Sequence, residues 1–134
     1  MQIENRKYVA KSLRLKDVYY DDVLRRKKIS TIRFGQVLFN DVLIELTFES
    51  KPALKINIQK IDYSKTFASI SEGDAINDGY DSLLNLKNDL KKYYPNIQDN
   101  SPITIIYFQL IDQSFFSSEL YTFEKTTDKS TFKT

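Results

Sequence analysis

The fold is decided by residues 42–59, VLIELTFESKPALKINIQ, which carry the clearest β-strand signal in the chain. Apolar side chains occupy every second position of 42–48 and again of 54–59, which places them on one face of each strand. A short polar turn that ends at Pro52 separates the two runs. Two alternating runs joined by such a turn predict a β-hairpin.

Three more segments outside this hairpin have the character of strands. Residues 8–15 alternate between apolar and polar side chains, and residues 29–34 are rich in β-branched side chains. Residues 102–111 form a strongly apolar run, which indicates a strand at the centre of a sheet.

Helical spacing of apolar side chains predicts three helices. One covers 18–27, and a second begins at a capping-box sequence formed by Ser71 and Asp74. The third covers 81–94 and ends before Pro95. The order of strands and helices favours an α+β fold, in which two to three helices flank a small, partly open β-barrel of mixed or antiparallel strands.

A chain of 134 residues is expected to form one domain. We expect that domain to span 1–111 and to be followed by a C-terminal extension, 112–134. Within the extension, 120–123 is predicted to be an edge strand and 125–134 a frayed polar tail. The extension is also the segment through which the chain would form a dimer.

The composition excludes several kinds of chemistry. The chain has no His and no Cys, which rules out a His general base, a Cys nucleophile and a Cys/His zinc site. The carboxylates of 72–81 do not have the spacing of a standard calcium loop, so we expect no metal and no cofactor. No secretory signal and no apolar run of membrane-spanning length is visible. We therefore expect a cytoplasmic protein without a membrane partner.

Basic side chains are concentrated near the N-terminus. The net charge is only +2, yet residues 1–33 contain ten Lys or Arg against four acidic residues, and all five Arg lie there. The densest part is 25–35, RRKKISTIRFG. Such a patch suggests a site for phosphate or carboxylate groups, while a solvated charged face is an equally good reading.

Two groups of motifs resemble a known family. The first is YYDDVL at 19–24 followed by KKISTIR at 27–33. The second is ISEGDAINDGY at 70–80, with a leucine-striped helix after it and IIYF at 105–108. Together they resemble the ASCH domain (activating signal cointegrator homology), a branch of the PUA-like superfamily. The family usually has Gly at the position of Arg26, so the chain departs from the pattern there.

The resemblance implies a PUA-like barrel with a cleft between barrel and helices. ASCH domains were proposed to bind RNA in that cleft, by analogy with PUA domains. Some small bacterial members instead hydrolyse N-acylated cytidine with a Lys, a Thr and an acid. Those residues correspond to Lys28, Thr31 and Asp78, although the family acid is Glu, one methylene longer than Asp78.

Each candidate residue also has an ordinary structural role open to it. Lys28 could be solvated, Thr31 could be a plain strand residue, and Asp78 could cap the helix that begins near 81. Thr31 and Arg33 share one face of a strand, and Lys28 reaches the same cleft only from the turn before it. Four tyrosines could stack on bases or simply pack against neighbouring elements: Tyr19, Tyr20, Tyr93 and Tyr94.

Two functional hypotheses follow, and the sequence favours the first. In the first, Arg25, Arg26, Lys27 and Arg33 bind the phosphates of RNA or of a nucleotide-like ligand. In the second, the chain is an amidohydrolase for a modified nucleoside that uses Lys28, Thr31 and Asp78. The hydrolase gains support if these three side chains meet within hydrogen-bond reach around an enclosed pocket. The binder gains support if Asp78 faces solvent as a helix cap and the basic turn borders an open groove.

Overall fold

A computed structural model describes residues 7–111 of the chain. The strands are β1 (Lys7–Ala10), β2 (Ser12–Arg14), β3 (Ser30–Phe34), β4 (Gln36–Phe39), β5 (Leu43–Thr47), β6 (Leu54–Asp62) and β7 (Ile103–Leu110). The helices are α1 (Tyr20–Leu24), α2 (Glu72–Asn77) and α3 (Leu83–Tyr93), with short 3-10 turns at Asp17–Tyr19 and Phe67–Ser69. The expectations for 112–134, including the edge strand at 120–123, lie outside the described residues.

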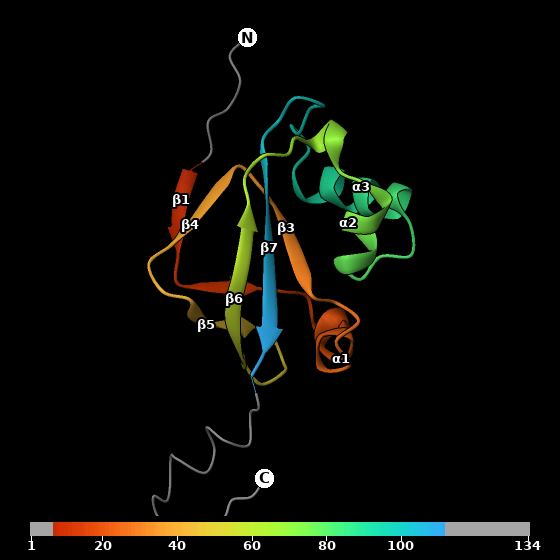
Figure 1. Ribbon diagram of the computed structural model, residues 1–134. Helices are drawn as coiled ribbons and strands as arrows, with labels where there is room; N and C mark the ends of the chain where they lie inside the picture. Colours follow the sequence, from red (N-terminus) through yellow and green to blue (C-terminus); the bar gives the residue numbers. More distant parts are fainter. Residues whose placement is uncertain (1–6, 112–134) are drawn as a thin grey trace, which may run out of the picture.

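Five strands form a curled sheet in the order β2-β5-β6-β7-β3, with the helices beside it (Figure 1). The predicted hairpin is β5 and β6, which pair antiparallel, and the predicted central strand is β7, which pairs antiparallel with β6 and β3. The register shifts between Ile58 and Lys60, where an irregularity bends β6. The expected α+β fold with a partly open barrel is confirmed.

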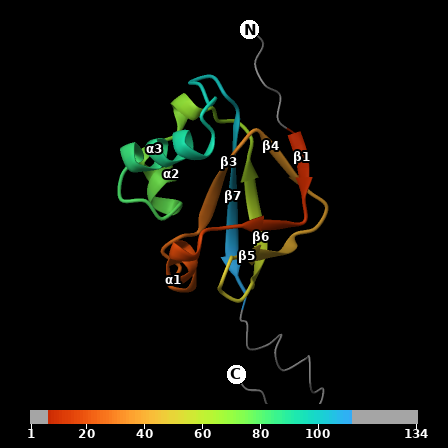
Figure 2. The same cartoon turned by 180° about the vertical axis from the view of Figure 1, so that it is seen from behind.

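The N-terminal strand prediction was wrong in detail, because 8–15 forms two strands that part at Lys11. The first, β1, pairs in parallel with β4, and the second, β2, pairs in parallel with β5 (Figure 2). Strand β4 was not predicted. It follows β3 directly because Gly35 adopts a φ of 85°, a conformation that suits glycine. The hydroxyl of Thr104 then fastens the start of β4 to β7 through Gly35 O at 2.6 Å and Val37 N at 3.2 Å.

Strand β7 is buried on both faces over most of its length, which accounts for its continuous apolar run. Ile106 packs into a cluster inside the barrel, together with Leu46 and Ile56. Its neighbour Ile105 packs into a second cluster, between the sheet and the helices, with Leu86 and Leu90 of α3. Successive side chains of a strand point to opposite faces, so one strand supplies both cores.

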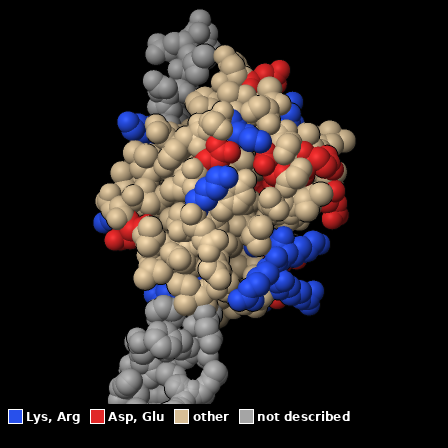
Figure 3. Space-filling view, viewed as in Figure 1, with Lys and Arg blue, Asp and Glu red and all other residues tan. Residues whose placement is uncertain are grey.

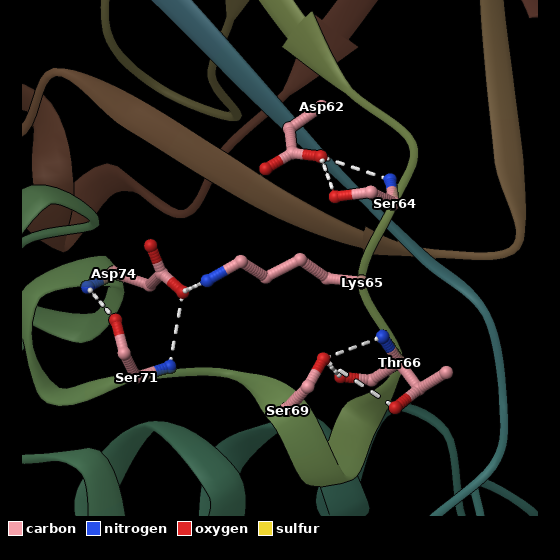
Figure 4. Close-up of polar contacts among 7 residues, drawn as sticks. All are labelled: Asp62, Ser64, Lys65, Thr66, Ser69, Ser71 and Asp74. Carbon is pink, nitrogen blue, oxygen red and sulfur yellow. Dashed lines mark hydrogen bonds and ion pairs between the residues drawn. The ribbon is translucent and has the colours of Figure 1, made fainter.

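Polar contacts fix the start of α2, as the capping-box sequence predicted. The Asp74 carboxylate accepts a hydrogen bond from Ser71 N at 2.9 Å, and Ser71 Oγ accepts one from Asp74 N at 3.1 Å. Lys65, from the segment after β6, reaches across to the same carboxylate at 2.7 Å (Figure 4). These contacts hold α2 in place relative to β6, and they thereby set the position of Asp78 at the end of that helix. No helix within 7–111 is long and apolar enough to cross a membrane.

Candidate functional site

A tight turn after α1 carries Lys28 into the molecule. The predicted helix over 18–27 ends early, at Leu24, because Arg26 takes a left-handed conformation with a φ of 61°. The backbone amides of Lys27 and Lys28 then both donate to Asp22 O, at 2.9 and 3.1 Å. Strand β3 begins only at Ser30, so Lys28 lies in the turn before it. This is the placement that lets Lys28 reach the same side as Thr31.

The Lys28 side chain is buried, with 2% of its surface exposed. Its ammonium nitrogen donates to Ser30 O at 2.9 Å and to Asp78 O at 2.8 Å, and it forms an ion pair with the Asp78 carboxylate. Gly79 permits this approach, since a Cβ there would lie 3.3 Å from Lys28 Cβ and its φ is +94°. Asp78 is thus buried against Lys28, and the alternative that it caps the next helix is wrong.

The Ser82 side chain performs that capping, because its Oγ accepts from Asn85 N at 3.1 Å. Asp78 itself terminates α2 as its C-cap, and only its backbone amide takes part in the helix. The carboxylate of Asp78 is therefore available for the contact with Lys28.

Burial, and next the positive charge of Arg33, hold the pKa of Lys28 well below its usual value of 10.5, while the Asp22 carboxylate opposes this shift. Burial has this effect because the charged form of an amine loses its hydration. An amine with a lowered pKa gives up its proton readily and can then accept one from a ligand or a hydroxyl.

Thr31 and Arg33 form a second pair on the adjoining strand. Thr31 is buried, and its Oγ1 accepts a hydrogen bond from Arg33 Nε at 3.2 Å. Arg33 also donates from Nη2 to Arg14 O at 2.8 Å, which anchors the guanidinium beside β2. Among the described residues no direct hydrogen bond joins Thr31 to Lys28 or Asp78.

A cavity of about 770 Å³ brings these two pairs together. Lys28, Thr31, Arg33 and Asp78 all line it, and α3 and the segment before α1 close its other sides. Its volume lies in the range of small-molecule sites, about 300–1,000 Å³. The arrangement combines an amine of lowered pKa, a hydroxyl and a guanidinium, groups that can accept a proton, attack a carbonyl and stabilise an oxyanion.

The basic side chains of 25–33, which the sequence analysis treated as one patch, lie in two different environments. Arg25, Arg26 and Lys27 are exposed and do not line the cavity, whereas Lys28 and Arg33 do. The turn places the three exposed side chains on the outside.

The tyrosines divide in a similar way. Tyr19, Tyr93 and Tyr94 line the cavity. Tyr20 does not, and its ring packs edge-on against Phe48 at 5.1 Å. Sequence reasoning did not assign Tyr80 to the site, although Tyr80 ends the motif at 70–80 and lines the cavity.

Comparison with known proteins gives a match of fold. No protein-family model and no curated protein sequence matches the chain. The crystal structure of an ASCH domain from Lactobacillus crispatus JV V101 superposes with a TM-score of 0.61 at 18% identity, covering 70% of each chain. The hypothetical protein PH0355 superposes with a TM-score of 0.56 at 17% identity, covering 79% of this chain and 100% of its own. The chain therefore has the fold of the ASCH-domain structure, which its motifs predicted.

Proposed function

We propose that the cavity binds a nucleoside and that the protein removes the acyl group from an N-acylated cytidine. The observation that supports this is the convergence of the three candidate residues. Lys28, Thr31 and Asp78 line one cavity, and the first and last form a buried ion pair. The hydrolase members that the sequence resembles use a Lys, a Thr and an acid. Asp78 can serve here despite its shorter side chain, because it already contacts Lys28.

The reaction assigns a separate task to each side chain. Lys28 first gives up its ammonium proton to solvent, which its lowered pKa favours. Thr31 Oγ then attacks the acyl carbon while its own proton passes to the neutral amine of Lys28. The C–N bond then breaks, and the Lys28 ammonium returns a proton to the leaving nitrogen of the base. Water hydrolyses the Thr31 ester, which releases the carboxylic acid and restores the hydroxyl.

Two neighbours support this sequence of steps. Arg33 stabilises the oxyanion that forms on the acyl oxygen, and Asp78 stabilises the ammonium form of Lys28. The missing hydrogen bond between Thr31 and Lys28 must form when substrate binds, as catalytic hydrogen bonds in ligand-free enzymes often do.

The test is hydrolysis of N-acetylcytidine, followed by the ultraviolet shift to cytidine. We expect turnover by the wild type, a loss of at least about 100-fold in Thr31→Val and in Lys28→Met, and retained turnover in Thr31→Ser. Lys55→Met is the control, because Lys55 lies on β6, is partly exposed and does not line the cavity. A wild type that leaves the substrate intact would overturn the proposal.

A second candidate function rests on the exposed basic turn. Arg25, Arg26 and Lys27 are exposed and directly follow α1. Figure 3 shows a cluster of basic side chains on the surface in the region of α1. We propose that this turn binds the phosphates of RNA. Replacing all three with Gln should weaken binding of a single-stranded RNA and reduce the salt dependence of its affinity, by about 0.7 in slope for each phosphate that the protein no longer neutralises. An unchanged salt dependence would contradict this role.

A further inference from the structure

A chain of hydrogen bonds runs along one wall of the cavity. The hydroxyl oxygens of Tyr19 and Tyr80 lie 2.7 Å apart, and Tyr80 donates to Asp89 Oδ2 at 2.9 Å. A phenol has one proton, and a carboxylate can only accept. Because Tyr80 gives its proton to Asp89, the hydrogen bond between the tyrosines must be donated by Tyr19.

Both phenols keep their protons at neutral pH. Burial raises the pKa of Tyr80 far above its usual value, and Tyr19 and Asp89 raise it further. Burial likewise raises the pKa of Tyr19 and outweighs the hydrogen bond with Tyr80, which lowers it. The direction of the chain, from Tyr19 through Tyr80 to Asp89, is thus fixed by the count of protons.

This direction determines what the wall offers to a ligand. With its proton committed to Tyr80, the Tyr19 oxygen presents only lone pairs, and the Tyr80 oxygen has no proton to spare. Both residues line the cavity. Hydrogen-bond donors in the cavity come from Lys28 and Arg33, which can only donate when they are protonated.

We infer that the Tyr19–Tyr80–Asp89 chain selects a ligand that brings an N–H donor to this wall, such as the exocyclic nitrogen of a cytosine ring. Lys28 Nζ lies 4.9 Å from the centre of the Tyr19 ring, so the selected group lies next to the reacting pair. This inference rests on the proposed function for placing the base in the cavity. Asp89 does not line the cavity and acts through Tyr80, as a positioning residue.

Cytidine and uridine are the matched probes, because the first carries an amino group where the second carries a carbonyl oxygen. We expect the wild type to bind cytidine about tenfold more tightly, as one hydrogen bond replaces an unfavourable contact between lone pairs. In Tyr80→Phe the Tyr19 proton is released towards the ligand, and the preference should fall to about onefold. The two nucleosides also differ at N3, but that difference is the same for every variant.

Asp89 gives an independent test. In Asp89→Leu the Tyr80 hydroxyl has lost its acceptor and donates its hydrogen bond to the Tyr19 oxygen instead. The Tyr19 hydroxyl then donates to the ligand, so the preference for cytidine over uridine should again be lost. Asp89→Asn retains an acceptor oxygen and should restore it. Tyr20→Phe is the control, since it removes the same atom from a tyrosine outside the cavity. Tyr93→Phe measures the contribution of the other phenol near Tyr19.

Calorimetric titration with both nucleosides, alongside circular dichroism to verify folding, decides the matter. A cytidine preference that folded Tyr80→Phe or Asp89→Leu retains would overturn the inference, as would a uridine preference or no binding of either nucleoside by the wild type.

The hydrolase proposal is judged separately. If the cytidine preference depends on Tyr80 but N-acetylcytidine is not hydrolysed, the inference is supported and the hydrolase proposal is contradicted. If N-acetylcytidine is hydrolysed but the cytidine preference is unchanged in Tyr80→Phe, the hydrolase proposal is supported and the inference is contradicted.

Discussion

The side-chain nitrogen of Lys28 is in contact with the carboxylate of Asp78, and neither side chain is more than 6% exposed. The pair joins the turn before β3 to the end of α2, so it connects the sheet to the helical layer. The same two side chains line the cavity. A group that is needed for both stability and chemistry must be tested for each separately.

Breaking this pair should destabilise the fold strongly. Below the lowered pKa of Lys28, where the amine carries its charge, Asp78→Asn keeps the shape of the side chain but leaves the Lys28 ammonium without its charged partner. The expected cost is about 3 kcal/mol in the free energy of unfolding. The double variant Lys28→Met with Asp78→Asn should recover most of that loss, because no charge remains buried. Urea denaturation measures both quantities.

The exposed pair of Lys55 and Glu45 provides the comparison. Its nitrogen and oxygen lie 2.7 Å apart, yet both side chains are 42% exposed. Glu45→Gln should therefore cost less than about 1 kcal/mol. Equal losses from Asp78→Asn and Glu45→Gln would contradict a strongly coupled buried pair.

The lowered pKa of Lys28 predicts a pH dependence of stability. Between the lowered pKa of the folded state and the usual value of 10.5, the unfolded chain binds more protons at this residue than the folded protein does. Stability at this site therefore rises with pH across that window. The free energy of unfolding of the wild type, minus that of Lys28→Met, should increase as the pH rises through this window towards 10.5. A difference that stays flat would mean that Lys28 remains charged beside Asp78.

Local patterns revealed most of the fold and the polar part of the site. The hairpin of β5 and β6 and the buried strand β7 follow from the spacing of apolar side chains, which is a local property. Strand β4 was not predicted, because it pairs in parallel with β1 and this pairing joins residues that are far apart in the chain. The condition that Lys28 reaches the side of Thr31 only from the turn before the strand follows from the alternation of side chains along a strand, which is a local property as well.

The tyrosine chain could not be found in the same way. Tyr19 and Tyr80 are separated by 61 positions, and the direction of their hydrogen bond depends on a third residue, Asp89. Only the folded arrangement shows that the three form one chain. The exposed position of Arg25 has a similar cause, because it depends on where the turn after α1 ends.

Acid should reveal the contribution of Asp74. Burial alone would raise the pKa of this carboxyl, but hydrogen bonds from Lys65 and Ser71 outweigh it and leave the pKa lowered. A lowered folded-state pKa stabilises the protein above the unfolded value and loses that effect as pH falls through the folded one. Between about pH 5 and pH 2, the wild type should lose stability more steeply than Asp74→Asn. Acid titrations of the two proteins under the same conditions, monitored by circular dichroism, would show this difference. Unfolding curves with the same dependence on pH would refute it.

Two glycine substitutions in adjacent residues should have opposite effects. Arg26 has a φ of 61°, a conformation that disfavours side chains with a Cβ, whereas Arg25 has a φ of −84°. Arg26→Gly should raise the free energy of unfolding by about 0.5–1 kcal/mol, because it relieves backbone strain. Arg25→Gly removes the same charge but only adds freedom to the unfolded chain, so it should lower that free energy by about 0.5–1 kcal/mol. Thermal unfolding of the two variants at matched ionic strength separates the backbone effect from the effect of charge, since the charge change is shared. If both variants were destabilised equally, the left-handed turn would not be the strained element that ends α1 and directs Lys28 inward.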